Sequence, residues 1–115
     1  MPDAIAGELT IAEDVITDLA GYAALESYGI VGMAAPTLSD GIAKLLPASR
    51  LRRGINVERT DDAIDIDLYV IIEHGTNLAE VSRMLADKVK FTLEDGAQLP
   101  VRNVNVHVQG VKVRD

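Results

Sequence analysis

Polar and apolar residues alternate most regularly between residues 55 and 72. Ile55 and Val57 alternate with polar neighbours, and the pair Asp61-Asp62 then forms a hairpin turn before a longer alternating run. The run predicts a second strand, whose apolar face consists of Ile64, Ile66, Leu68, Val70 and Ile72. The opposite face is polar at its start and apolar at its end, so we expect part of it to be covered. That face consists of Asp65, Asp67, Tyr69, Ile71 and Glu73.

Three other segments have the pattern of shorter strands. Residues 7–9 form a very short one, and residues 30–34 form a small strand that ends before Pro36. In the last strand, valines at 104, 106 and 108 face inward, while Asn105, His107 and Gln109 face outward. Beyond Gly110 the apolar positions move to Val111 and Val113, which is the change of face that a β-bulge produces.

The first of two helices is predicted after residue 10. Thr10 and Glu13 have the spacing of a capping box, in which the hydroxyl accepts from an early backbone N–H and the carboxylate reaches back. Gly29 follows the helix as a left-handed cap. The expected apolar stripe consists of Ile11, Val15, Leu19, Tyr22 and Ala23.

The second helix follows the long strand. Asn77 and Glu80 have the same capping pattern, and Gly96 ends the helical period. Its apolar stripe consists of Leu78, Val81, Leu85, Val89 and Leu93.

These elements follow the order β-α-β-loop-β-β-α-β. Helices with one apolar stripe and strands with one apolar face predict an α+β fold, with two helices packed on one face of a small, mainly antiparallel sheet. Residues 37–54 are the longest irregular stretch, with a helical turn expected over residues 41–46 before Pro47. The length of 115 residues without internal linkers predicts a single domain, 1–115.

Composition excludes several kinds of site. The chain has no cysteine, so disulfides, thiolate metal sites and a cysteine nucleophile are excluded. With one Phe, three Tyr and no Trp, it has few aromatic residues, which weakens an interpretation that needs stacking platforms for single-stranded nucleic acid. We see no signal peptide and no run of about 20 apolar residues that would span a bilayer. We expect no metal or cofactor.

Charge is segregated along a chain of net charge −7. Residues 1–43 contain no Lys or Arg, whereas the expected loop carries a basic cluster. An acidic chain opposes binding to nucleic acid. The cluster is either a solvated loop or a docking surface for an acidic protein patch, for an acidic helix of another copy, or for anionic lipid. The candidate partner-binding residues in it are Lys44, Arg50, Arg52 and Arg53.

Few polar residues have the spacing of a catalytic site. Asp65 and Asp67 share a strand face, and His107 with Asn105 would join them as a hard-metal or acid–base cluster if the last strand lies alongside. The alternative is a solvated strand face, which we favour because cation sites gather more ligands at tighter spacing. No serine lies in a nucleophile elbow, and no phosphate-binding loop or zinc-protease pattern occurs. We therefore do not expect an enzyme.

Four stretches of the chain resemble the alkaline shock protein family of Gram-positive cell-envelope stress proteins. Two are specific: an apolar strand that contains Tyr69 and leads through His74-Gly75 into a helix opened by Asn77, and the V-N-V-x-V-x-G-V pattern that starts at Val104. The four stretches are residues 7–16, 28–33, 66–75 and 104–111.

The resemblance implies a non-catalytic cytoplasmic protein, free or peripheral at the inner face of the cell membrane. It implies self-association or docking to a membrane-anchored partner, and Tyr69 and Ile71, on the outer strand face, join the candidate partner-binding residues. The alternative is an accessory subunit of a dihydroxyacetone-kinase-like or fatty-acid kinase, because short members of the family can be encoded beside such proteins.

Overall fold

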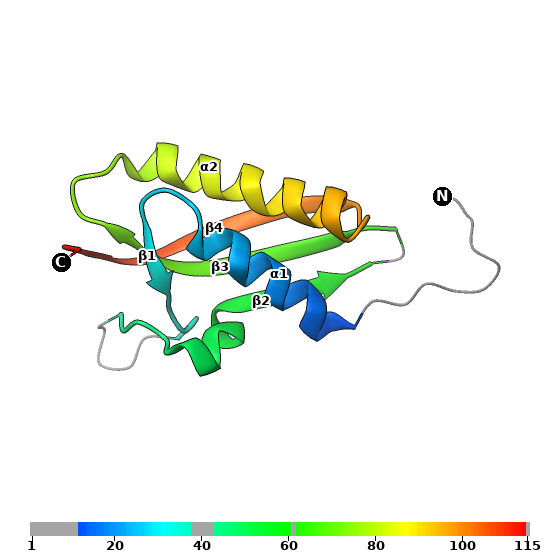
Figure 1. The fold of residues 1–115 in the computed structure, drawn as a ribbon, viewed down its shortest axis with the longest axis horizontal. Helices are drawn as coiled ribbons and strands as arrows, with labels where there is room; N and C mark the ends of the chain where they lie inside the picture. Colours follow the sequence, from blue (N-terminus) through cyan, green and yellow to red (C-terminus); the bar gives the residue numbers. More distant parts are fainter. Residues whose placement is uncertain (1–11, 38–42, 61, 115) are drawn as a thin grey trace.

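The computed structural model describes residues 12–37, 43–60 and 62–114, which form an α+β fold (Figure 1). The helices are α1 (Glu13–Leu25) and α2 (Leu78–Phe91), with a 3-10 segment η2 (Ala48–Gly54) and a π-helical extension of α2, η3 (Thr92–Gly96). The strands are β1 (Ile30–Met33), β2 (Ile55–Arg59), β3 (Ile64–Glu73) and β4 (Val101–Lys112). The predicted class is confirmed, and the strand predicted at residues 7–9 lies outside the described residues.

Strand β3 is the centre of the sheet. On one edge it pairs antiparallel with β1 and β2, which lie end to end, Ile30 opposite Ile72 and Ile55 opposite Leu68. On the other edge it pairs with β4 over its whole length. That last pairing is parallel because the chain returns through α2, and parallel neighbours need such a crossover. The sheet is thus mainly antiparallel, as predicted, with one parallel pair.

Strand β4 contains two irregularities. The register against β3 shifts between Val70 and Ile71, which leaves Gln109 as the extra residue. A second shift between Ile64 and Asp65 makes Arg102 extra. The bulge predicted next to Gly110 is confirmed.

Helix α2 uses the predicted stripe from Val81 onward, whereas Leu78, its first predicted member, is 43% exposed. Val81, Leu85 and Val89 are buried, and Leu93 continues the stripe into η3. The side chain of Asn77 accepts a hydrogen bond from the backbone N–H of Glu80 at 3.0 Å, so the predicted cap is present. The carboxylate of Glu80 instead binds Arg83.

Helix α1 turns only part of the predicted stripe to the core. Ala23 is buried and Leu19 packs against the core, as predicted. Val15 and Tyr22, however, are 48% and 70% exposed, so the prediction was wrong for these two residues. Ile11 lies outside the described residues. The buried residues are mainly small: Ile16, Thr17, Ala20, Gly21, Ala23 and Ala24. A Cβ on Gly21 would lie 3.3 Å from Ile55 Cδ1, so the helix approaches β2 through its small residues.

The ends of α1 also depart from the prediction. Its N-cap is Ala12, without a side-chain hydrogen bond, and Thr10 lies outside the described residues. The helix ends at Leu25, and Gly29 has the predicted positive φ of 82° in the turn that follows.

The face of the sheet away from the helices is partly covered, as predicted. Ile71 is 0% exposed there. A Cβ on Gly110 would lie 2.9 Å from Ala43 Cβ, and one on Gly32 would lie 2.6 Å from Leu45 Cδ2, so residues 43–45 lie against this face. Leu46 N–H donates to Met33 O at 2.8 Å and holds this segment beside β1. The described part of the turn predicted at residues 41–46 is not helical; the 3-10 segment follows Pro47.

Candidate partner-binding surfaces

Arg52 is engaged within the chain. Its Nε and Nη2 donate to the two carboxylate oxygens of Asp18 at 2.8 and 2.9 Å, and Nη1 lies 3.3 Å from Asp14 Oδ2. The hydrogen bond from Arg52 lowers the pKa of Asp18. Arg52 therefore ties η2 to α1, and a role for it as a free docking residue does not fit this geometry.

The other basic candidates of the loop are exposed. Lys44, Arg50 and Arg53 all face solvent, and none of them takes part in the ion pairs of the described residues. The backbone of Arg50 (φ −131°, ψ 20°) leaves the helical region and bends η2. Partner binding by these three residues stays a prediction.

Between α1 and η2 there is an open groove of about 540 Å³. Tyr22 and Leu25 of α1 are exposed beside it, and Arg52 bridges it to Asp18. Its lining is formed by Thr17, Asp18, Gly21, Tyr22, Leu25, Ser49, Leu51 and Arg52.

The polar half of the outer sheet face forms a network. The rings of Tyr69 and His107 stack with centroids 4.5 Å apart, and His107 Nε2 lies 3.0 Å from Asp67 Oδ1. Hydrogen bonding by His107 lowers the pKa of Asp67. Tyr69 is half-buried in this stack. Ile71, two residues on, is fully buried under residues 43–45, so the expectation that it faces a partner was wrong.

The structure brings together only some of the residues of the metal site considered as an alternative. Asp67 meets His107, but Asp65 binds Arg102 in a forked ion pair, with Nε at 3.1 Å, and accepts from Asn103 at 3.1 Å. Within the described residues, no three carboxylate or histidine groups converge on one point. Asp65 and Asp67 therefore each have a hydrogen-bonding partner within the chain.

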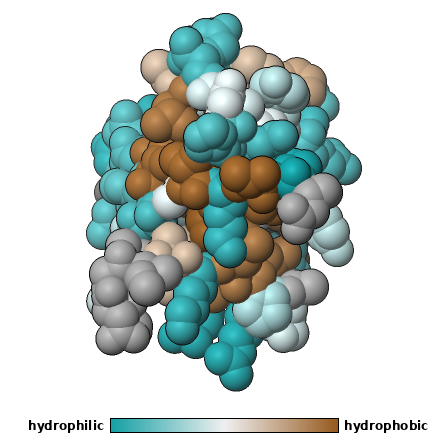
Figure 2. All heavy atoms as spheres, turned by 90° about the vertical axis from the view of Figure 1, so that its left-hand side faces the viewer, coloured by the Kyte–Doolittle hydropathy of each residue, from teal (hydrophilic) through white to brown (hydrophobic). Residues whose placement is uncertain are grey.

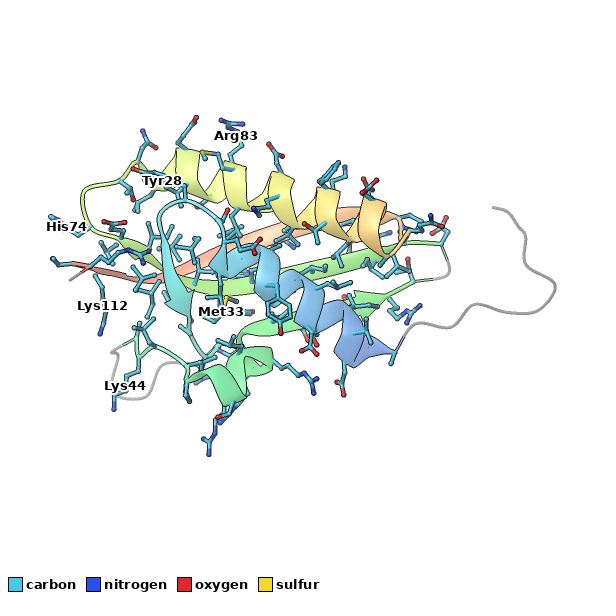
Figure 3. The ribbon with its side chains drawn as sticks, viewed as in Figure 1. Tyr28, Met33, Lys44, His74, Arg83 and Lys112 are labelled. Carbon is cyan, nitrogen blue, oxygen red and sulfur yellow. The ribbon has the colours of Figure 1, made fainter. Side chains whose placement is uncertain are left out.

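A third surface, which sequence reasoning missed, lies at the end of the molecule where β4 finishes. Val111 and Val113 are 46% and 73% exposed, and Figure 2 shows an apolar area with a polar rim on this end. Lys44 and Lys112 lie at the same end (Figure 3). We call Lys44, Val111, Lys112 and Val113 the end surface. The sequence did contain a sign of this surface, since Val111 and Val113 alternate with Lys112. We interpreted that pattern only as evidence of a β-bulge.

The remaining charged groups near the end surface are engaged. Arg114 Nε lies 3.3 Å from Glu73 Oε1, and its Nη2 donates to Ile30 O at 2.7 Å. His74, the second histidine, is exposed in the turn after β3. Its backbone N–H donates to Lys112 O at 2.7 Å and fixes the end of β4.

The fold and these surfaces define a small α+β domain in which Asp18, Asp65 and Asp67 each have a side-chain partner within the chain. The chain belongs to the alkaline shock protein 23 family, described as "cell envelope-related function", whose profile matches residues 2–113. The resemblance seen in the sequence is thereby confirmed.

Curated relatives agree with this assignment. The chain is 40% identical over 108 residues to the uncharacterized protein YloU of Bacillus subtilis strain 168, covering 93% of this chain and 90% of that protein. It is 36% identical to the uncharacterized protein Spy1614 of Streptococcus pyogenes, covering 93% and 89%. It is 25% identical to a stress response regulator gls24 homolog of Streptococcus pyogenes, covering 100% of this chain and 64% of the relative.

No solved structure matches this chain. In the part of the chain that the structure describes, no helix has the length and apolarity to span a bilayer.

Proposed function

We propose that this chain is a non-catalytic interaction domain of the cell-envelope stress response, which docks an acidic segment of a membrane-anchored protein and also self-associates. The family description and the stress-regulator relatives support the cellular role. We place the protein in the cytoplasm, at the inner face of the cell membrane. The relatives named above give no support to the kinase-subunit alternative.

The end surface is the observation that carries the docking proposal. In a protein of net charge −7, Lys44 and Lys112 flank exposed apolar side chains at one end, and neither lysine has a carboxylate partner among the described ion pairs. An apolar centre with a cationic rim suits a partner segment with acidic and apolar residues. Arg50 and Arg53 extend the basic character along the same loop.

The arrangement of the polar groups supports a non-catalytic role. Asp65 is paired with Arg102, Asp67 is hydrogen-bonded to His107, and Asp18 is held by Arg52. A catalytic acid or base needs instead a free position aimed at a substrate.

The docking proposal is tested by capture from native cells. Wild-type protein should retain a membrane-anchored envelope protein, and Lys44→Glu with Lys112→Glu should lose it, because the charge reversal opposes an acidic segment. Lys90→Glu, on the exposed side of α2, makes the same kind of charge change elsewhere and should retain the partner. Equal retention by the double variant contradicts the proposal, as does equal binding of wild-type protein to protein-free vesicles of anionic lipid, which would make lipid the ligand.

A further inference from the structure

Strand β4 has an edge that no described strand occupies. It pairs with β3 on one side only, and it is the longest strand of the sheet at 12 residues. Unpaired edges normally carry charges, prolines or bulges that discourage another strand from joining. Between Asn103 and Val111 there is no Lys, Arg, Asp, Glu or Pro, and the two bulges lie at Arg102 and Gln109. A regular, uncharged stretch of edge remains between the bulges.

The opposite rim of the sheet is protected. β2 is only five residues long and ends in the charged pair Glu58-Arg59, and β1 is four residues long. Short, charged edge strands pair poorly with other chains. Among the described strands, β4 is therefore the one whose edge is open to a partner.

An open hollow runs along this edge between β4 and α2. It is lined by Ser82, Arg83 and Ala86 of α2, by residues 104–107 of β4, and by Asp67. The valines of the stretch are incompletely covered: Val104 and Val106 are half-buried and Val108 is 36% exposed. The edge therefore offers backbone groups that no described strand pairs, together with apolar surface.

We propose that a second copy of this chain pairs with this edge, β4 antiparallel to β4, about a two-fold axis through Val106. The inference rests on the self-association that is part of the proposed function. In this register Val104 lies opposite Val108 of the second copy, and Asn105 lies opposite its His107. Valines stay on the helix side and polar residues on the outer side, as the pleat requires.

The α2 helices are complementary about the same axis. Ser82, Arg83 and Ala86 lie beside residues 104–107, so they are level with Val106. Ser82 and Ala86 are small and allow a close approach. Arg83 already lies 3.5 Å from Asp87 Oδ2 in its own helix, and an antiparallel second helix brings another Asp87 toward it. A two-fold interface needs a self-complementary patch of this kind.

Cysteine pairs test the register, because the chain has no cysteine of its own. Residues opposite one another in an antiparallel pair have Cα atoms about 4.5–5.5 Å apart, within the range of about 4.4–6.8 Å that a disulfide bridges. Val106→Cys should form a homodimeric disulfide on mild oxidation. Val104→Cys and Val108→Cys should not do so alone, but a mixture of the two should cross-link. Equal cross-linking of all three single variants contradicts the register.

A charge placed on the edge tests the interface without a new bond. Asn105 is exposed, so Asn105→Lys should fold, and it should weaken the dimer roughly fivefold or more by placing like charges near the axis. Arg53→Glu, in the 3-10 segment η2 that leads into β2 on the opposite rim of the sheet, should leave the dimer unchanged.

Sedimentation of the wild-type chain at micromolar concentration separates the two proposals. A strict monomer overturns both this inference and the self-association part of the proposed function. A dimer that tolerates Asn105→Lys and gives no selective Val106→Cys disulfide overturns this inference alone. Partner capture through Lys44 and Lys112 is measured separately. A strict monomer, or a dimer that does not use the β4 edge, would leave that part of the proposed function intact.

Discussion

At the scale of single residues, a predicted partner-binding side chain remains available only where no other segment of the same chain binds or covers it. The sequence places Arg52 in the same basic cluster as Arg50 and Arg53, but only Arg52 meets Asp18 across 34 positions. Tyr69 and Ile71 lie on the same face of β3, but only Ile71 is fully buried, because residues 43–45 cover it. Both differences arise from contacts between segments distant in sequence, which local patterns do not contain.

Arg52→Gln should reduce stability at neutral pH and lose its effect in acid. A carboxyl whose pKa is lowered on folding stabilises the protein above its unfolded pKa, and this contribution disappears as the pH falls through the folded pKa. Because Arg52 lowers the pKa of Asp18, the difference between wild type and variant should be full at neutral pH and should shrink below about pH 4. Urea unfolding midpoints across pH measure it. Arg53→Gln is the control, and a pH-independent loss would mean that the ion pair is not the cause.

At the scale of elements, the sequence predicted what periodicity alone determines. Large apolar residues at regular steps located β3 and the buried face of α2 correctly. The face of α1 was only partly predicted because most of its core contacts, apart from Ile16, are made by small residues such as Gly21. Small residues carry little hydrophobic signal beside Val15 and Tyr22. The parallel pairing of β4 and the cover over Ile71 depend on tertiary topology, so alternation could show only that something covers that face.

Two substitutions in α1 compare a buried residue outside the predicted stripe, Ala20, with an exposed residue inside it, Val15. The loss of stability should be larger at Ala20. Ala20 is fully buried, so Ala20→Leu should overpack the helix–sheet contact and cost about 1–3 kcal/mol in free energy of unfolding. Val15 is half exposed, and Val15→Ala should change that free energy by no more than about 0.5 kcal/mol. Urea denaturation of both variants measures the difference. A larger loss in Val15→Ala than in Ala20→Leu would support the original stripe instead.

At the scale of the whole molecule, the two proposed contacts use different physics. The end surface concentrates Lys44 and Lys112 at one end of a protein of net charge −7, so its attraction to an acidic segment is electrostatic. The β4 edge is uncharged from Asn103 to Val111 and associates through backbone hydrogen bonds and apolar burial. One molecule can therefore hold an envelope partner and a second copy at once, because one contact lies at the end of β4 and the other along its length.

Salt should separate these two contacts in a single preparation. Raising the ionic strength from about 0.1 M to about 1 M shortens the screening length from about 10 Å to about 3 Å, which weakens attraction between exposed charges. Partner capture through Lys44 and Lys112 should therefore fall steeply over this range. The dimer measured by sedimentation should persist, because burial of apolar surface is not screened. Lys44→Glu with Lys112→Glu should leave the dimer and its response to salt unchanged. A dimer that dissociates in parallel with the partner would show that the basic residues, and not the β4 edge, hold two copies together.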